Sequence, residues 1–381
     1  MLSRLRQLAF KLESVEGTVE SLAAADAKAL VSDPKINFDP EMLEQNPVLS
    51  SFSKIASISG KRPGSGTFSM LLKGSGDKTV EPDWASHIKA CGFEISVLKS
   101  IAIGAISSST DFIHGEVITG GTSAGTGKVI KNTVNGASKI YYVVLTGTLQ
   151  SGEVLTGGTS GATATTSGSP TIEGKVILPI SESISSATMG TYENGIRKVL
   201  KGARGKLKFT GESGKPFTKA YEFMGVEAGI TDLAMLTGIT RQSTKPPAFY
   251  NASFSINGVS AKIKSIEIDI ATVLGIRDDV NDQRGILSFV ITDRKITGSF
   301  DPEKVLVATH DFWGIWFAGT EMELDFIVGA TTGNKFNFYA PKAQYQKVED
   351  ESRDGIDIAK TAFSLNGHPD LANSEFCILA L

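Results

Sequence analysis

Apolar and polar residues alternate along much of the chain, which is the pattern of β-strands buried on one face. Residues 35–39 (KINFD) and 265–269 (SIEID) show this alternation most clearly. Later in each half of the chain two longer strands follow in direct succession. They are expected at residues 199–210 and 217–224, and at 335–347 and 355–365. The pattern predicts a mainly β protein.

Two short aromatic stretches are exceptions to the strand pattern. Residues 83–90 and 311–318 place apolar and aromatic side chains, including Trp84 and Trp313, at helical spacing. We interpret each stretch as one short helix that packs its aromatic face on a β-structure, rather than as an aromatic cage for a ligand.

A motif at residues 60–68 (GKRPGSGTF) has a degenerate second copy at residues 292–300 (TDRKITGSF). Arg, Gly and Phe match at one constant offset, 298 − 66 = 232. The surroundings repeat in the same order: a strand, a long loop, the motif strand, a short helix and a closing strand pair. Because chance would have to reproduce the order as well as the residues, we infer a duplication. The sequence therefore predicts two tandem β-barrel or β-sandwich units, each with a short flanking α-helix.

The composition changes between residues 112 and 174, where Gly, Thr and Ser dominate and a shorter repeat appears. Residues 115–123 (GEVITGGTS) recur as residues 152–160 (GEVLTGGTS). We interpret residues 112–174 as a small inserted β domain. The expected organisation is an N-terminal arm at 1–33, a first β unit at 34–111 and 175–227, the insertion at 112–174, and a second β unit at 228–381.

Charge and composition exclude several classes of function. A formal net charge of −3 offers no basic surface for tight binding to nucleic acid. The two cysteines, Cys91 and Cys377, form no C-x-x-C pair, so neither a disulfide framework nor a thiolate metal site is expected. No apolar run reaches the ~18 residues of a membrane span, and none forms a signal peptide. We therefore expect no membrane insertion.

Motifs that carry chemistry in other proteins are incomplete here. Residues 121–125 (GTSAG) satisfy G-x-S-x-G, but no helix is expected after them, so a β-turn is predicted instead of a nucleophile elbow. Asp77 separates the Gly and Lys that a phosphate loop needs side by side. The acidic residues at 278–282 lack the Gly and Glu of a calcium loop, and the four histidines form no metal-binding pair. The sequence predicts no enzyme, no cofactor and no metal.

A series of short segments resembles the major tail tube proteins of long-tailed bacteriophages, particularly siphophages. In chain order they are residues 11–18 (KLESVEGT), 59–62 (SGKR), 90–93 (ACGF), 192–195 (YENG), 202–205 (GARG), 291–298 (ITDRKITG) and 340–343 (APKA). The resemblance covers most of the chain and rests on the order of the series. The insertion at 112–174 departs from the family pattern.

The resemblance implies a structural virion protein that polymerises as stacked rings into the tail tube, the channel for genome ejection into the host. A duplicated chain would supply six barrels as a homotrimer; the alternative is a homohexamer. The implied partners are further copies of the chain, the tail terminator, the tail tip and tape-measure proteins, and viral DNA that passes through the lumen without sequence-specific binding. The implied location is the virion tail, with assembly in the host cytoplasm.

Two sets of residues are candidates for these roles. Because a channel wall should avoid cations that grip phosphate, the lumen-facing candidates are polar strand positions: Asn37, Asp39, Glu267 and Asp269. The arm at 1–33 and the loops at 40–63 and 273–286 are long and poor in apolar periodicity, so we expect an adjacent ring to order them. The inter-ring contact candidates are Leu12, Val15, Phe52, Lys54, Asp278 and Asp279. The insertion should project outward and be dispensable for assembly.

The alternative from another class is a phage or cell-surface adhesion or decoration protein that binds glycans through the Gly/Thr-rich insertion. A hydrolase is the third possibility. Electron microscopy of the purified protein separates these hypotheses, since tubes or rings are expected only of a tail tube protein.

Overall fold

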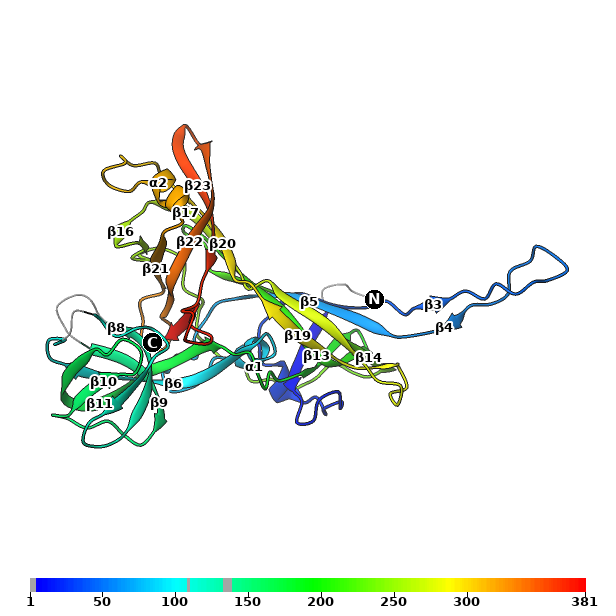
Figure 1. The fold of residues 1–381 in the computed structure, drawn as a ribbon. Helices are drawn as coiled ribbons and strands as arrows, with labels where there is room; N and C mark the ends of the chain where they lie inside the picture. Colours follow the sequence, from blue (N-terminus) through cyan, green and yellow to red (C-terminus); the bar gives the residue numbers. More distant parts are fainter. Residues whose placement is uncertain (1–4, 108–109, 133–138) are drawn as a thin grey trace.

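The computed structural model describes residues 5–107, 110–132 and 139–381 (Figure 1). Strands dominate the fold, so the predicted mainly β class is confirmed. The helical elements are α1 (Ala85–Lys89), α2 (Phe312–Ala318) and the 3-10 helix η1 (Ala24–Ala27). The strands are β1 (Arg6–Leu12), β2 (Ser32–Phe38), β3 (Met42–Leu43), β4 (Ile58–Ser59), β5 (Pro63–Leu71), β6 (Phe93–Ile103), β7 (Val117–Gly120), β8 (Thr126–Asn132), β9 (Lys139–Thr146), β10 (Val154–Gly157), β11 (Thr163–Pro179), β12 (Ala187–Glu193), β13 (Ile196–Glu212), β14 (Thr218–Asp232), β15 (Ser255–Ile256), β16 (Val259–Ser260), β17 (Ile263–Asp269), β18 (Thr272–Asp278), β19 (Ile286–Arg294), β20 (Thr297–Pro302), β21 (Glu321–Val328), β22 (Phe336–Arg353), β23 (Ile356–Leu365) and β24 (Cys377–Ala380).

One antiparallel sheet of eight strands runs through both halves of the chain. Its order is β2-β5-β14-β13-β17-β20-β23-β22, and the pairing of β13 with β17 joins the two halves. A second layer contains β1, β12, β6, β11, β24 and β21, and it pairs with the first through the N-terminal parts of β13 and β22. We call the eight-stranded layer the long sheet.

The ladders of the two halves have matching registers. Ile36 lies opposite Gly66 in the β2–β5 ladder, and Ile268 lies opposite Gly298 in the β17–β20 ladder. Both strands therefore repeat at the offset of 232, and the offset of 230 expected for the first strand is corrected by two residues. Gly298 is required sterically, because a Cβ there would lie 2.5 Å from the backbone carbonyl oxygen of Glu267.

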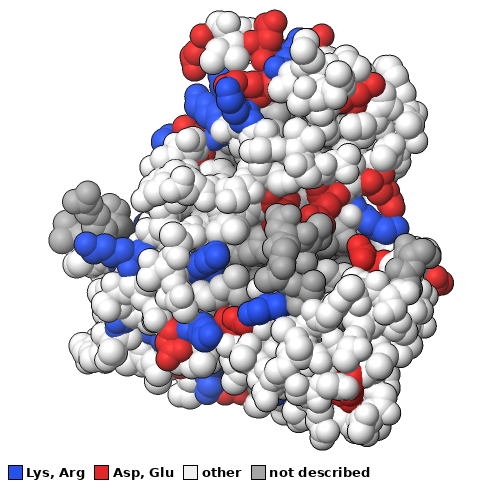
Figure 2. All heavy atoms as spheres, turned by 90° about the vertical axis from the view of Figure 1, so that its left-hand side faces the viewer, with Lys and Arg blue, Asp and Glu red and all other residues white. Residues whose placement is uncertain are grey.

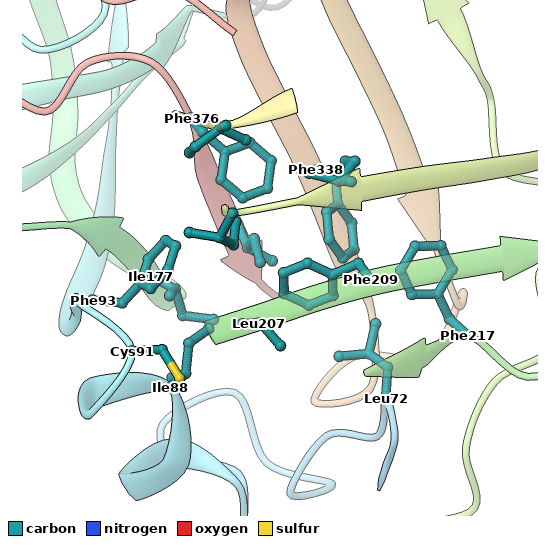
Figure 3. Packing of buried hydrophobic residues seen from close by; sticks show 14 of the residues in the cluster. Leu72, Ile88, Cys91, Phe93, Ile177, Leu207, Phe209, Phe217, Phe338 and Phe376 are labelled. Atoms are coloured by element: carbon teal, nitrogen blue, oxygen red, sulfur yellow. The ribbon is translucent and has the colours of Figure 1, made fainter. Parts of the chain in front are cut away.

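Both halves contribute to one continuous hydrophobic core. Phe209 and Phe217 come from the first half and Phe326 and Phe338 from the second, and all four are buried within one cluster. Their rings pack in tilted and stacked pairs, such as Phe326 and Phe338 with centroids 4.7 Å apart. Figure 3 shows Phe338 of the second half beside Phe209 and Phe217 of the first, with ring centroids 5.3 Å and 5.1 Å away. Each buried phenyl ring stabilises the fold by ~1.5–3 kcal/mol, so the halves hold each other in place.

The two predicted helices lie where the aromatic stretches indicated. Trp84, at the N-terminus of α1, is fully buried and donates from its indole N–H to the carbonyl of Lys73 (2.7 Å). Phe312 of α2 is buried beside Tyr345, while Trp316 is partly exposed and donates to the carbonyl of Gln346 (3.1 Å). Both helices thus pack on strands through aromatic residues, as predicted.

The N-terminal segment is not the extended arm that the sequence predicted. Residues 6–12 form β1, which pairs along its length with β12, and Leu8 and Phe10 are buried in the core. The apolar alternation in this strand is short and flanked by basic residues, which obscured it in the sequence. Fewer of residues 1–33 are therefore free to contact another copy than the sequence predicted.

Candidate assembly interface

The long sheet has one apolar and one polar face. Residues that point into the core, such as Ile36, Phe223 and Phe363, are buried. The opposite face carries small hydroxyl and charged side chains from all eight strands. Its members include Lys35, Asn37, Ser65, Thr67, Lys206, Lys208, Glu222, Glu267, Asp269, Thr297, Ser299, Glu349, Glu351 and Lys360. We call this surface the polar face.

Lysines on the polar face are largely neutralised by glutamates on the same or a neighbouring strand. Lys208 pairs with Glu267 at 2.6 Å across the β13–β17 junction, and Lys360 pairs with Glu351 at 3.0 Å. Lys347 likewise lies 2.6 Å from a carboxylate oxygen of Glu349. Figure 2 shows one side of the molecule, on which Lys and Arg lie interspersed with Asp and Glu and form no single basic patch. Cations paired in this way bind phosphate weakly.

The two ends of the long sheet are open edges. In the described part of the chain, β2 pairs only with β5, and residues 347–353 of β22 pair only with β23. The residues on these two edges are exposed at Asp33, Lys35 and Asn37 on β2 and at Glu349 and Glu351 on β22. Open edges offer backbone donors and acceptors to another strand. Pro34 on β2 removes one donor, a feature typical of edge strands.

Residues 272–294 form a hairpin, β18–β19, that we call the second arm. It lies on the first half of its own chain (Figure 1), where Ile286 and Phe289 are buried against Val226. Asp282 pairs with Lys201 at 2.5 Å, and Arg284 reaches Glu227 at 3.3 Å. This hairpin is therefore docked.

Close backbone contact also holds the second arm. Gly202 has φ +56, and a Cβ there would lie 2.8 Å from the carbonyl oxygen of Leu287. At its tip the second arm reaches the base of the other long hairpin, where Lys61 pairs with Asp278 at 2.9 Å.

Residues 40–62 form the corresponding hairpin, β3–β4, which we call the first arm. It projects away from the body of the molecule (Figure 1), and every residue from 41 to 59 is exposed. Val48 and Phe52 near its tip are fully exposed, at 102% and 109%. At the offset of 232 the first arm corresponds to residues 272–294, so the two hairpins have equal length. One is docked and the other is free.

Glu16 ties the N-terminal segment to the second arm. Its carboxylate accepts hydrogen bonds from Ser288 Oγ (2.5 Å) and Arg204 Nη1 (2.9 Å), and pairs with Arg277 at 3.0 Å. Burial alone would raise the pKa of Glu16, but the hydrogen bonds from Ser288 and Arg204 outweigh it, and the pKa lies below its ordinary value.

Two buried glutamates connect the repeats of the inserted domain. Glu116 accepts hydrogen bonds from the backbone N–H groups of Thr159 (3.0 Å) and Ser160 (2.9 Å). Glu153 accepts from the backbone N–H of Ser123 (2.9 Å) and from its hydroxyl (2.8 Å). Each repeat thus closes the turn of the other. Ser123, in the G-x-S-x-G motif, belongs to a turn, and among the described residues no histidine is a partner of its hydroxyl.

The lumen-facing candidates all lie on or beside the polar face. Asn37, Glu267 and Asp269 are on its strands, and Asp39 follows β2 directly, where its N–H donates to the carbonyl of Pro63 (3.0 Å). Their exposure to a channel stays a prediction.

The inter-ring candidates are scattered over several segments. Leu12 is partly buried against the core, and Val15 is 64% exposed. Phe52 and Lys54 lie on the first arm, and Asp278 and Asp279 lie at the tip of the second. Their contact with other copies also stays a prediction.

A family model for phage tail tube proteins matches residues 3–366, nearly the whole chain. The chain belongs to the phage tail tube protein family. No relative was found among curated proteins. As a member of this family, the protein is a structural component of a phage tail.

Within the ranges that the structure describes, no helix is long and apolar enough to cross a membrane. Over the same ranges, no cluster of three or more His, Cys, Asp or Glu residues is arranged to hold a metal ion.

Sequence reasoning missed the charged residues at the two open edges. Lys35, Glu349 and Glu351 were not candidates, although residues 347–351 (KVEDE) place charged side chains at every second position, the spacing of one face of a strand. The signal was present, but only the ladders show that these residues stand at the two ends of one sheet.

Proposed function

We propose that the protein assembles as stacked rings into the tail tube, that three chains form each ring, and that the polar face lines the channel through which DNA passes. Within a ring, β22 of one copy pairs antiparallel with β2 of the next. The long sheets of successive copies then continue into one closed barrel, which removes every open edge.

The observation that carries this proposal is the junction inside the chain. There, residues 208–212 of β13 pair with residues 269–265 of β17, so the second half already attaches to the first as a neighbour would. The offset of 232 maps 265–269 to residues 33–37 of β2. Strand β14 corresponds to β23 at an offset of 363 − 223 = 140, because Phe223 and Phe363 lie opposite the equivalent glycines Gly66 and Gly298. Strand β13 corresponds to β22, and a bulge between Tyr345 and Lys347 raises the offset to 141 for the residues of β22 after the bulge. Residues 208–212 thus map to 349–353.

Charges on the two open edges are complementary in this register. Thr210 lies opposite Glu267 in the internal junction, and the mapping places Glu351 opposite Lys35 of the next copy. Glu349 becomes the diagonal neighbour of the same lysine. The internal junction contains the ion pair Lys208–Glu267 at 2.6 Å, and the mapped pair has its signs exchanged, with glutamate on β22 and lysine on β2. Opposite charges on facing strands stabilise pairing and fix the register.

The number of chains follows from the duplication. Because each chain supplies two units joined edge to edge, three chains supply the six units expected of a tail tube ring. The identical interface repeats head to tail, which gives a closed ring when its rotation closes.

Charge exchange tests the ring joint. Lys35→Glu should prevent ring and tube formation, because it places three carboxylates together, while the exposed position leaves the monomer folded. Adding Glu349→Lys and Glu351→Lys should restore assembly. Negative-stain microscopy shows whether rings and tubes form, and native mass measurement counts the chains in a ring. Assembly of the Lys35→Glu variant, or a ring of six chains, would contradict the proposal. Lys245→Glu, a charge reversal at an exposed residue between β14 and β15, outside the long sheet and both arms, is the control.

The inserted domain continues from β6 and β11 of the second layer, and we propose that it lies on the outside of the tube. The turn at Gly161 has φ +67, and a Cβ there would have nothing within 4 Å. A short peptide inserted at this turn should leave tubes of normal diameter and be accessible to an antibody along their length. Loss of assembly would place the insertion in the interface.

A further inference from the structure

The first arm exposes apolar side chains that its own chain does not cover. Met42, Leu43 and Ile58 are more than half exposed, and Val48 and Phe52 are fully exposed. An extended hairpin with this many exposed apolar residues needs a partner surface. The second arm, its counterpart, has such a surface on the first half of the chain.

The contacts of the second arm identify the equivalent surface on the second half. Arg284 of the second arm corresponds to Phe52 of the first. Arg284 lies beside Glu227 at 3.3 Å, and Glu227 also pairs with Arg62 at the base of the first arm (3.6 Å). At the offset of 232, Arg62 corresponds to Arg294. Arg284 therefore docks close to Arg62 on the first half. By the same correspondence, Phe52 should dock close to Arg294 on the second half.

A surface pocket of about 170 Å³ is present at that position. Ile180, Ile184 and Ile291 supply its apolar lining. The rest of the lining is polar and consists of Ser181, Thr292, Asp293 and Arg294. The guanidinium of Arg294 is held in place by Glu375 (2.5 Å) and by the carbonyl of Ile180 (2.9 Å). A volume of ~150 Å³ is large enough for a benzene ring, so the pocket has room for a phenyl group that packs on its isoleucines. A fixed guanidinium is also a favourable neighbour for an aromatic face.

We propose that the first arm of one copy docks across the second half of the next copy in the same ring, with the Phe52 side chain in this pocket. The inference rests on the proposed ring. The β13–β17 junction places the second arm on the first half of its own chain, and the β22–β2 joint would place the first arm of one copy on the second half of the next in the same way. Its occupant is a second copy of this chain. The first and second arms would then alternate around the ring. Each arm would lie across one β unit, and its tip would contact the base of the following arm.

This arrangement assigns Phe52 to contacts within a ring, whereas the length of the loop alone suggested contacts between rings. Val48 offers an internal control. It corresponds to Val280 of the docked arm, and Val280 remains 97% exposed although its arm is docked. Val48 should therefore stay exposed in the ring.

The test combines truncation and cross-linking on the full chain. Phe52→Ala should raise the protein concentration needed for ring formation at least about tenfold, the scale of a buried aromatic anchor, whereas Val48→Ala should leave it unchanged. Phe52→Cys with Ile184→Cys should form a disulfide between copies in isolated rings, and Val48→Cys with Ile184→Cys should not. Because the arm is exposed in the monomer, neither change at Phe52 should affect folding.

The outcomes separate this inference from the proposed function. Rings that form normally with Phe52→Ala, or a Phe52–Ile184 cross-link that forms only in stacked tubes, overturn the docking inference and leave the ring proposal standing. Failure of the unmodified protein to form rings overturns the ring proposal itself.

Discussion

The first and second arms are equal in length and occupy equivalent places in the two halves, yet their environments differ. The second arm buries Ile286 and Phe289 on its own chain, whereas every residue from 41 to 59 of the first arm is exposed. The same hairpin therefore needs a neighbouring unit, and only one of the two has that neighbour within the chain. In the proposed ring, the contact that the second arm makes within the chain is the one that the first arm makes between copies.

The largest difference between the arms should appear in the stability of the isolated chain. Phe289→Ala in the docked arm removes a buried ring and should lower the free energy of unfolding by ~3–5 kcal/mol. Phe52→Ala in the free arm should change it by less than ~0.5 kcal/mol. Denaturant unfolding of both variants at a concentration below assembly measures the contrast; similar losses would mean that the first arm also packs within the chain.

Gly202 gives a smaller and more specific contrast. Gly202→Ala should cost ~1–3 kcal/mol, because the backbone has positive φ and the new Cβ would press on the carbonyl of Leu287. The second arm should then be cut faster by protease within residues 279–285. Gly195→Ala, at φ +95 with nothing near the new Cβ, is a matched control that carries the strain without the contact. Equal cleavage rates in the two variants would show that Gly202 does not hold the arm.

Acid should loosen the second arm and leave the first unchanged. The pKa of Glu16 is lowered in the folded state, so its stabilising contacts are complete above its ordinary pKa near 4.5. These contacts are lost as pH falls from that value through the lowered pKa. Amide exchange in β19 should accelerate over that window relative to β4. Glu16→Gln should reduce the added pH dependence without abolishing it, because the pKa of Asp282, which pairs with Lys201, is also lowered. A pH response of equal size in both arms would contradict the role of Glu16.

The repeat motif, the two helices and the mainly β class could be predicted from the sequence, because periodicity and residue order report directly on them. The two-residue correction at β2 arose because residues 35–39 and 265–269 look alike at either offset. Only the ladder, with Ile36 opposite Gly66 and Ile268 opposite Gly298, distinguishes 230 from 232.

The candidate interface was predictable only in outline. The first arm was expected to need a partner from its length and composition. The matching of Lys35 with Glu351, or of Phe52 with the pocket at Ile184, depends on strand registers and on the packing of distant segments. β1 was missed for a related reason, since its strand pairs with residues far away in the chain.

The most direct test of the trimeric ring is a cross-link at its joint. In the proposed register Glu351 of one copy lies opposite Lys35 of the next, at a Cβ separation of about 4.5–5.5 Å, which is close to disulfide distance. The native cysteines, Cys91 and Cys377, are buried. Lys35→Cys with Glu351→Cys should therefore give, on a non-reducing denaturing gel, a ladder that ends at three chains. A ladder that continues to six chains would contradict the trimeric ring, and the absence of any cross-link in assembled tubes would contradict the joint.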